Sequence, residues 1–223
     1  MVGTISLYNS EAERLHTIYL GEAPEYGKST FTQRMTREIE RVKALYPEAL
    51  YVGIADSAVD NWSFWEQHAD KLLLDYFHAS QYLPRLAQVA PPGKTGTSPA
   101  EKKHQLQHEP DFADKLVDEA KRLSKKKSLG KTVRENLNKA LTYFTNQCYR
   151  MDYAGFRANH LPIGSGVTEA ACQVLVKQRL CGSGMRWKEK GAKVVLSLRA
   201  LSESTSRWTQ FWDKINQFGV IPC

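Results

Sequence analysis

Two short apolar runs, each ending at an aspartate, constrain the fold more than any other feature of the sequence. LYVGIA (50–55) leads into Asp56, and KLLL (71–74) leads into Asp75. Continuous apolar runs of this length are typical of strands that are buried on both faces of a parallel sheet. Residues 60–69 between them predict a short helix. The sequence therefore predicts an α/β fold in which two strands of a mixed sheet end at a carboxylate.

The N-terminal part adds a hairpin and a helix to this sheet. Residues 2–8 and 14–20 are rich in β-branched and aromatic residues, and the polar NSEAE between them predicts a turn. Ser29 is expected to cap a helix that continues to residue 46, ahead of Pro47. Its apolar residues at helical spacing are Phe31, Met35, Ile39, Val42 and Leu45. The expected order is β-β-α-β-α-β.

The composition then changes twice along the chain. Residues 88–103 are mostly Pro, Gly, Ser, Thr and Lys, and they predict a loop. Helical periodicity over 111–127 and 132–148 predicts an all-helical insertion. The expected organisation is a sheet portion over 1–80, the loop and helical insertion over 81–160, and C-terminal helices that complete the core over 161–223.

Helices are also expected in the C-terminal segment. Gly164-Ser165-Gly166 leads into a helix at about Val167, a second Gly-Ser-Gly at 182–184 ends it, and another helix runs from about Lys190 to Leu201. The final segment is amphipathic, and its aromatic residues are expected to pack in the core. These apolar residues are Trp208, Phe211, Trp212, Ile215 and Phe218.

Positive charge is concentrated in one stretch of the sequence. The chain of 223 residues has 31 Lys and Arg against 24 Asp and Glu, a net charge of +7. Residues 170–199 hold seven of the basic residues and one acid, Glu189. An excess of positive charge indicates either a polyanionic partner or nothing more than a need for solubility. The basic residues that would contact a polyanion, which is DNA if the resemblance described below holds, are Lys177, Arg179, Arg186, Lys188, Lys190 and Lys193.

Several classes of protein are excluded on composition. No run of 18 apolar residues is present, so no membrane span or membrane partner is expected. The four cysteines form no CxxC motif, which argues against a zinc site or a disulfide framework. The start of the sequence does not read as a signal peptide, so a cytoplasmic protein is expected.

Three carboxylates are candidates for chemistry: Asp56, Asp75 and Glu169. A cluster of carboxylates holds hard cations such as Mg²⁺, and two such ions support phosphoryl transfer. The simpler interpretation is structural, because an Asp after a strand and a Glu in a first helical turn are common capping residues. His78 completes an Asp-x-x-His unit with Asp75. His104 and His108 have metal-compatible spacing, but no third ligand is visible.

Four blocks of sequence resemble a known family. In order, they are IADSAVDNW, LLLDYFHAS, MDYAGFRANHLPIGSGVTEAAC and RLCGSGMRWKEKGAKVVLSLRAL. They are similar to the conserved blocks of bacterial insertion-sequence transposases of the Kra type, over residues 1–87 and 140–215. These are DDE enzymes with a ribonuclease-H-like fold, related to the Mutator-like group. The resemblance implies DNA cleavage and strand transfer at inverted repeats, with target DNA as a second partner.

The resemblance also implies a site and its cofactor. Asp56 matches the second catalytic aspartate, and Glu169 matches the catalytic glutamate; both would bind Mg²⁺ or Mn²⁺, as two ions in the full-length enzyme. Asp75 and His78 match the supporting D-x-x-H signature. A homo-oligomer associated with the nucleoid is implied as well. Two departures stand out: Ser57 replaces a glycine and is expected to strain its turn, and Gln173 replaces a lysine.

The largest departure from the family is the absence of any Asp before Asp56. A ribonuclease-H-like domain begins with three antiparallel strands, and its first catalytic aspartate lies on the first of them. Only two strands are expected here before the helix at 29–46. The resemblance therefore implies that the first strand, its aspartate and an upstream DNA-binding region are missing. The alternative, with Asp56 as first acid and Asp75 as second, conflicts with the strand count.

Three functional hypotheses follow from the sequence. The leading one is a C-terminal catalytic-domain fragment of a DDE transposase that is inactive alone. The second is a non-catalytic remnant that binds DNA or a full-length transposase. The third is another ribonuclease-H-like nuclease, whose site Asp60 would complete.

Overall fold

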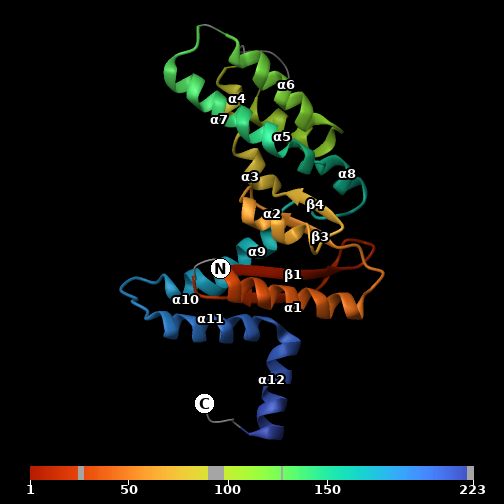
Figure 1. Ribbon diagram of the computed structural model, residues 1–223, viewed down its shortest axis with the longest axis vertical. Helices are drawn as coiled ribbons and strands as arrows, with labels where there is room; N and C mark the ends of the chain where they lie inside the picture. Colours follow the sequence, from red (N-terminus) through yellow and green to blue (C-terminus); the bar gives the residue numbers. More distant parts are fainter. Residues whose placement is uncertain (25–27, 90–97, 127, 220–223) are drawn as a thin grey trace. The chain divides into compact units, whose positions relative to one another are not determined.

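The structure, a computed structural model, describes residues 1–24, 28–89, 98–126 and 128–219 (Figure 1). The chain divides into two compact units. We call Met1–Ala49 with Gly166–Cys223 the terminal unit, and Leu50–Ser165 the central unit. The protein is mixed α/β and mostly helical, which confirms the expected class. The segment boundaries expected at residues 80 and 160 both fall inside the central unit.

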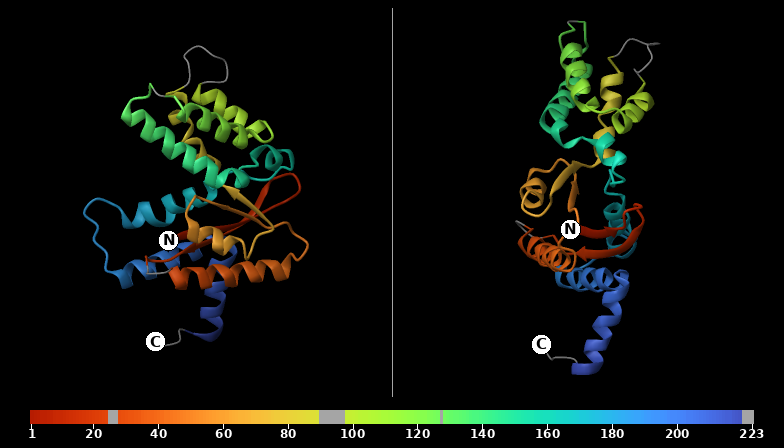
Figure 2. Two further views of the ribbon diagram at one scale, coloured as in Figure 1. Left: turned by 45° about the horizontal axis from the view of Figure 1, so that its top comes forward. Right: turned by 90° about the vertical axis from the view of Figure 1, so that its right-hand side faces the viewer.

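A β-hairpin and a long helix begin the terminal unit. Strands β1 (Val2–Tyr8) and β2 (Arg14–Gly21) pair antiparallel, as expected. Helix α1 (Ser29–Leu45) lies along the hairpin (Figure 1, Figure 2). A Cβ added at Gly3 would overlap the terminal methyl of Met35 in this helix, so the Met35 side chain packs directly on the glycine. Ser29 is not the cap: Lys28 precedes the helix in a left-handed conformation, with φ 56° and no capping side chain.

Helices from the C-terminal segment complete this unit. Helix α9 (Gly166–Ala171) packs against β1, and α11 (Glu189–Glu203) packs against β2. The π-helical segment η3 (Cys172–Lys177) and the short α10 (Gln178–Leu180) continue from α9. The residues buried together in this core are Ala171, Leu175, Leu196 and Ala200.

The two edges of the hairpin differ. The outer edge of β2 is covered, because the Tyr19 N–H donates to Ser204 Oγ at 3.0 Å. Met1 and Glu22 exchange two hydrogen bonds, so the alternation of an antiparallel ladder turns the backbone groups of Thr4 and Ser6 away from β2. No backbone group of a described residue pairs with Thr4 or Ser6 on that outer side. Among the described residues, β1 is therefore the open edge of the hairpin.

The central unit contains a second, parallel pair of strands. Strands β3 (Val52–Ala55) and β4 (Lys71–Leu74) pair in register from Val52 with Lys71 to Ala55 with Leu74, and α2 (Val59–Trp65) connects them. The order β-β-α-β-α-β expected for the start of the chain is confirmed, because β1, β2, α1, β3, α2 and β4 follow one another. The single mixed sheet is wrong for the described residues, which form two separate two-stranded sheets.

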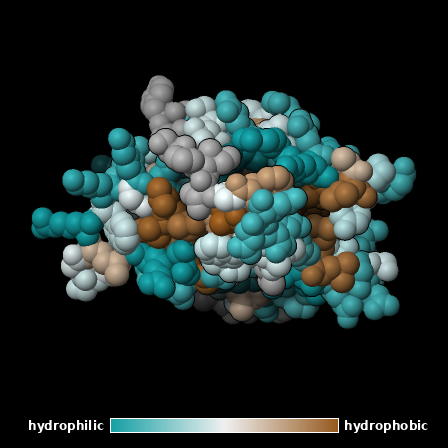
Figure 3. Space-filling model, turned by 90° about the horizontal axis from the view of Figure 1, so that it is seen from below, coloured by the Kyte–Doolittle hydropathy of each residue, from teal (hydrophilic) through white to brown (hydrophobic). Residues whose placement is uncertain are grey.

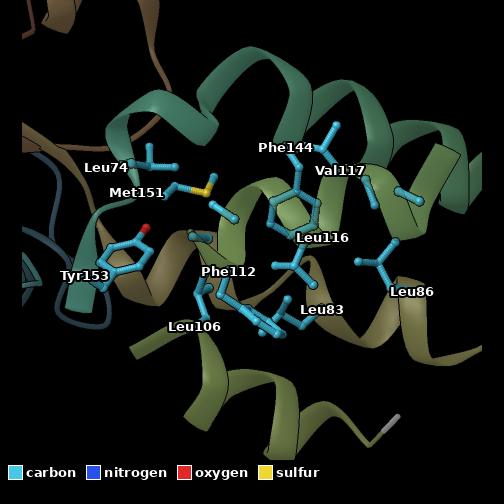
Figure 4. Close-up of a cluster of buried hydrophobic side chains, with 14 of the residues drawn as sticks. Leu74, Leu83, Leu86, Leu106, Phe112, Leu116, Val117, Phe144, Met151 and Tyr153 are labelled. Carbon is cyan, nitrogen blue, oxygen red and sulfur yellow. The ribbon is translucent and has the colours of Figure 1, made fainter. Parts of the chain in front are cut away.

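Helices build most of the central unit and its core (Figure 4). They are α3 (Tyr76–Ser80), α4 (Leu83–Ala87), α5 (Pro99–His108), α6 (Phe112–Ser124), α7 (Lys131–Gln147), the 3-10 turn η2 (Cys148–Arg150) and α8 (Tyr153–Ala158). Leu137, Ala140 and Phe144 of α7 are buried on the face that the periodicity predicts.

Part of the expected loop at 88–103 is helical. Ser98 accepts a hydrogen bond from the Glu101 N–H at 3.1 Å, and the Glu101 side chain accepts one from the Ser98 N–H, so a capping box starts α5. Residues 90–97 of that loop lie outside the described residues. Ser98-Pro99-Ala100-Glu101 is a typical start of a helix, whereas the Pro, Gly, Ser and Thr content of the segment predicted a loop.

The aromatic residues of α12 (Thr205–Phe218) are not core residues, which corrects the expectation. None of its described residues is buried, and Trp212 and Phe218 are 45% and 70% exposed. Trp208, Phe211 and Trp212 contact one another instead. Hydrophobic residues are visible between hydrophilic ones in the view from below (Figure 3). Within the described chain, no helix is both long and apolar enough to cross a bilayer.

Candidate functional site

Asp56 lies where β3 ends, with its side chain exposed. Its Oδ1 accepts hydrogen bonds from the Ala58 N–H at 3.0 Å and from Asn61 Nδ2 at 2.9 Å. Ala58, not Asp56, is the residue that precedes α2. Hydrogen bonds of this kind fix the orientation of a carboxylate that binds a metal. Asp56 is therefore a solvent-accessible carboxylate held in a defined direction.

The turn after Asp56 is not strained, which corrects the expectation for Ser57. Ser57 has no positive φ; among the described non-glycine residues, positive φ occurs at Ala12, Lys28, Asp111 and His160. A residue with a side chain therefore adopts this turn without the left-handed backbone that favours glycine.

Asp75 is almost completely buried, with 1% of its surface exposed. Its Oδ1 accepts the His78 N–H at 2.9 Å and lies 3.0 Å from His78 Nδ1. Its Oδ2 accepts the Ser165 N–H at 2.5 Å. The first of these bonds caps α3, so the simpler structural interpretation holds for Asp75. We call these contacts the Asp75 network.

The Asp75 network keeps the carboxylate charged. Burial alone would raise the pKa of Asp75, but the hydrogen bonds from Ser165 and His78 outweigh it and hold the pKa below its ordinary value. The segment before Ser165 is fixed beside the same strand end, because the Tyr76 N–H donates to Ile163 O at 3.0 Å. Asp75 thus joins β4, α3 and residues 163–165, and it orients His78.

Two buried tyrosine hydroxyls were not anticipated from the sequence. Tyr143 Oη lies on α7 near Ser57, and Tyr153 Oη on α8 has no hydrogen-bond partner among the described residues. Burial raises the pKa of both phenols far above the usual range, and the charge of Asp75 adds to it. Both therefore stay protonated. Helical periodicity favoured Phe144 as the core residue of α7, and nothing in the sequence distinguished Tyr143 beside it.

Glu169 belongs to the terminal unit and is exposed in the first turn of α9. A carboxylate is favourable there because it faces the positive end of the helix dipole. The π-helical segment that follows is held by Arg199 of α11, whose Nη2 donates to Val174 O at 2.9 Å. Asp56 and Glu169 thus belong to different units of the chain.

The expected basic surface is present in the terminal unit, with one correction. Lys177, Arg179, Arg186, Lys188 and Lys190 are exposed, and the structure gives them no ion pair with a described residue. Lys193 is exposed too, but its Nζ lies 3.6 Å from buried Glu22. That pairing makes Lys193 less available for a phosphate than its neighbours.

The histidine pair of α5 is a local stack. The rings of His104 and His108 lie 4.2 Å apart, and His108 Nδ1 contacts the His104 carbonyl at 2.8 Å. One nitrogen of His108 is thus engaged by the helix itself. No described residue adds a third ligand to this pair.

Comparisons of the chain with family models, curated proteins and solved structures gave no match.

Replacing Asp75 with Asn is expected to destabilise the protein at pH 7 by about 2–4 kcal/mol, because the amide NH₂ would face an N–H donor inside a buried site. The folded-state pKa is lowered, so the stabilisation by the carboxylate is present above the unfolded pKa of about 3.9 and is lost as the pH falls through the folded value. In urea titrations, the difference in free energy of unfolding between wild type and Asp75→Asn should therefore become smaller below pH 4.

Asp118→Asn is the matched control for this change of charge. Its side chain is 82% exposed, so its effect should stay within about 0.5 kcal/mol. Equal stability of Asp75→Asn and Asp118→Asn at pH 7 would contradict the importance of the Asp75 network.

Proposed function

We propose that the chain is the C-terminal part of a DDE transposase catalytic domain, with a ribonuclease-H-like fold, that binds DNA and does not cleave or join it alone. The observation that carries the proposal is Asp56: an exposed, oriented carboxylate at the carboxyl end of a half-buried parallel strand. Functional groups in open α/β sheets gather at that end of the strands.

The strands agree with an incomplete sheet of this kind. The antiparallel hairpin β1–β2 and the parallel pair β3–β4 occur in the order that the proposed fold requires. The outer edge of β1 has no backbone partner among the described residues. The proposed fold contains one more antiparallel strand than these, and that strand would carry the first catalytic aspartate.

The donor set fits a hard divalent cation in part. Asp56 and Glu169 present exposed carboxylates, which suit Mg²⁺ or Mn²⁺, whereas both oxygens of Asp75 already accept hydrogen bonds. When bound, such ions stabilise the attacking and leaving oxygens in phosphoryl transfer. The chain's own residues orient Asp56 through Ala58 and Asn61, and orient His78 through Asp75. Two carboxylates in place of three predict weak metal binding.

A titration with Mn²⁺ tests the role of Asp56. Asp56→Asn should weaken Mn²⁺ binding about tenfold, since it removes an anionic ligand worth roughly 1.4 kcal/mol or more. The free ion is measured by electron paramagnetic resonance. The matched control is Asp60→Asn, an exposed acid in the first turn of α2. Equal loss in the two variants would favour a site completed by Asp60, and no loss in Asp56→Asn would contradict the proposed ligand.

A non-catalytic DNA-binding protein is the second candidate, and the exposed cations of the terminal unit favour it. Lys and Arg that neutralise phosphates give an affinity that depends on salt and little on sequence. This candidate shares the DNA-binding step of the first and differs from it in needing no metal.

DNA binding is expected to weaken as salt rises, with a slope of about 0.9 in log K against log salt for each phosphate contact. The double variant Lys188→Gln/Lys190→Gln should lower that slope by up to about two, measured by fluorescence anisotropy on duplex DNA. The double variant Lys131→Gln/Lys139→Gln, which removes two exposed charges from α7, is the control. An affinity independent of salt would contradict both candidates.

A further inference from the structure

The segment between α10 and α11, residues 181–188, is folded into a tight turn. The Met185 N–H donates to Gly182 O at 3.1 Å, and Gly184 has φ 74°, a conformation that favours glycine. The Met185 side chain packs over Gly182, where an added Cβ would lie 3.1 Å from its Sδ. The turn therefore has a defined shape ahead of residues 186–188.

Trp187 follows this turn and is 44% exposed. The edge of its ring lies beside Gly191 in α11, where an added Cβ would be 3.8 Å from Cε3. Trp187 is not part of the buried cluster of the terminal unit. A large aromatic ring that is supported on one side and exposed, without a role in the core, offers a flat surface for a ligand.

The surroundings of Trp187 are cationic. Arg186 and Lys188 are its neighbours in the sequence, and both are exposed. Within residues 177–190 the only acid is Glu189. The chemistry that matches a basic segment with an exposed aromatic ring is a polyanion that also carries flat, apolar groups.

We propose that Trp187 stacks on an unpaired base of single-stranded DNA while Arg186 and Lys188 contact the flanking phosphates. Bases in a duplex are stacked on one another, so only a single strand presents a free base face to the ring. This inference rests on the DNA-binding function proposed above and adds to it a preference for unpaired strands.

The test compares single-stranded oligothymidine with duplex DNA of the same length, on the full chain at fixed salt. Trp187→Ala should weaken binding to the single strand about tenfold, within the range for loss of one stacked base, and change duplex binding less than twofold. Trp187→Phe should retain most of the affinity because it keeps a ring. Oligothymidine should also quench tryptophan fluorescence in the wild type more than in Trp187→Phe.

Trp212→Ala is the matched control. Trp212 is 45% exposed, nearly as much as Trp187, but it lies on α12 away from the basic segment in the sequence. It should leave both affinities unchanged. Circular dichroism of each variant confirms that the fold is retained.

Four outcomes overturn the inference. Equal binding of single strands by wild type and Trp187→Ala, with salt-dependent duplex binding intact, removes the inference and leaves the proposed function standing. Equal loss on both DNAs shows that Trp187 shapes the basic segment and does not stack. Loss of binding to anionic phosphatidylserine vesicles, but not to DNA, assigns Trp187 to a lipid surface. No DNA binding by the wild type removes both proposals.

Discussion

The buried charge of Asp75 sets the arrangement of the central unit around it. A carboxylate removed from water is costly unless hydrogen bonds replace its hydration, and here His78 and Ser165 supply them. Satisfying the charge fixes the end of β4, the start of α3 and residues 163–165 to one another. The strand beside β4 is β3, and the Asp75 N–H donates to Ala55 O at 2.8 Å. The position of Asp56, directly after Ala55, therefore depends on the same set of contacts.

Short strands in both units depend on helices for their stability, since a two-stranded sheet is at best marginally stable by itself. Leu73 and Leu74 of β4 are completely buried in a core that helices mostly build. In the terminal unit, α1, α9 and α11 contact the hairpin, and Ser204 satisfies the edge of β2. The open edge of β1 is the place where this support is missing among the described residues.

The sequence predicted the strands and the long helices well, because alternation and helical spacing are local signals. It located both Asp56 and Asp75 at strand ends, since both follow apolar runs, and of the two only Asp75 caps the helix that follows. It missed the division into two sheets, which depends on pairing over a long range. It assigned Trp208 and Trp212 to the core, because amphipathic spacing does not reveal whether another element covers the apolar face. The partners of Asp56, and the buried hydroxyl of Tyr143, depend on neighbours that only folding brings close.

Under the proposed function, Asp56 and Glu169 supply two catalytic carboxylates where a DDE enzyme uses three, and the exposed cations of the terminal unit bind DNA. The most direct measurement is a strand cleavage and joining assay with the purified chain, element-end DNA, and Mg²⁺ or Mn²⁺. The expected result is salt-dependent DNA binding without cleaved or joined products. Metal-dependent cleavage and joining that disappears in Asp56→Asn would contradict the claim that this chain is catalytically incomplete.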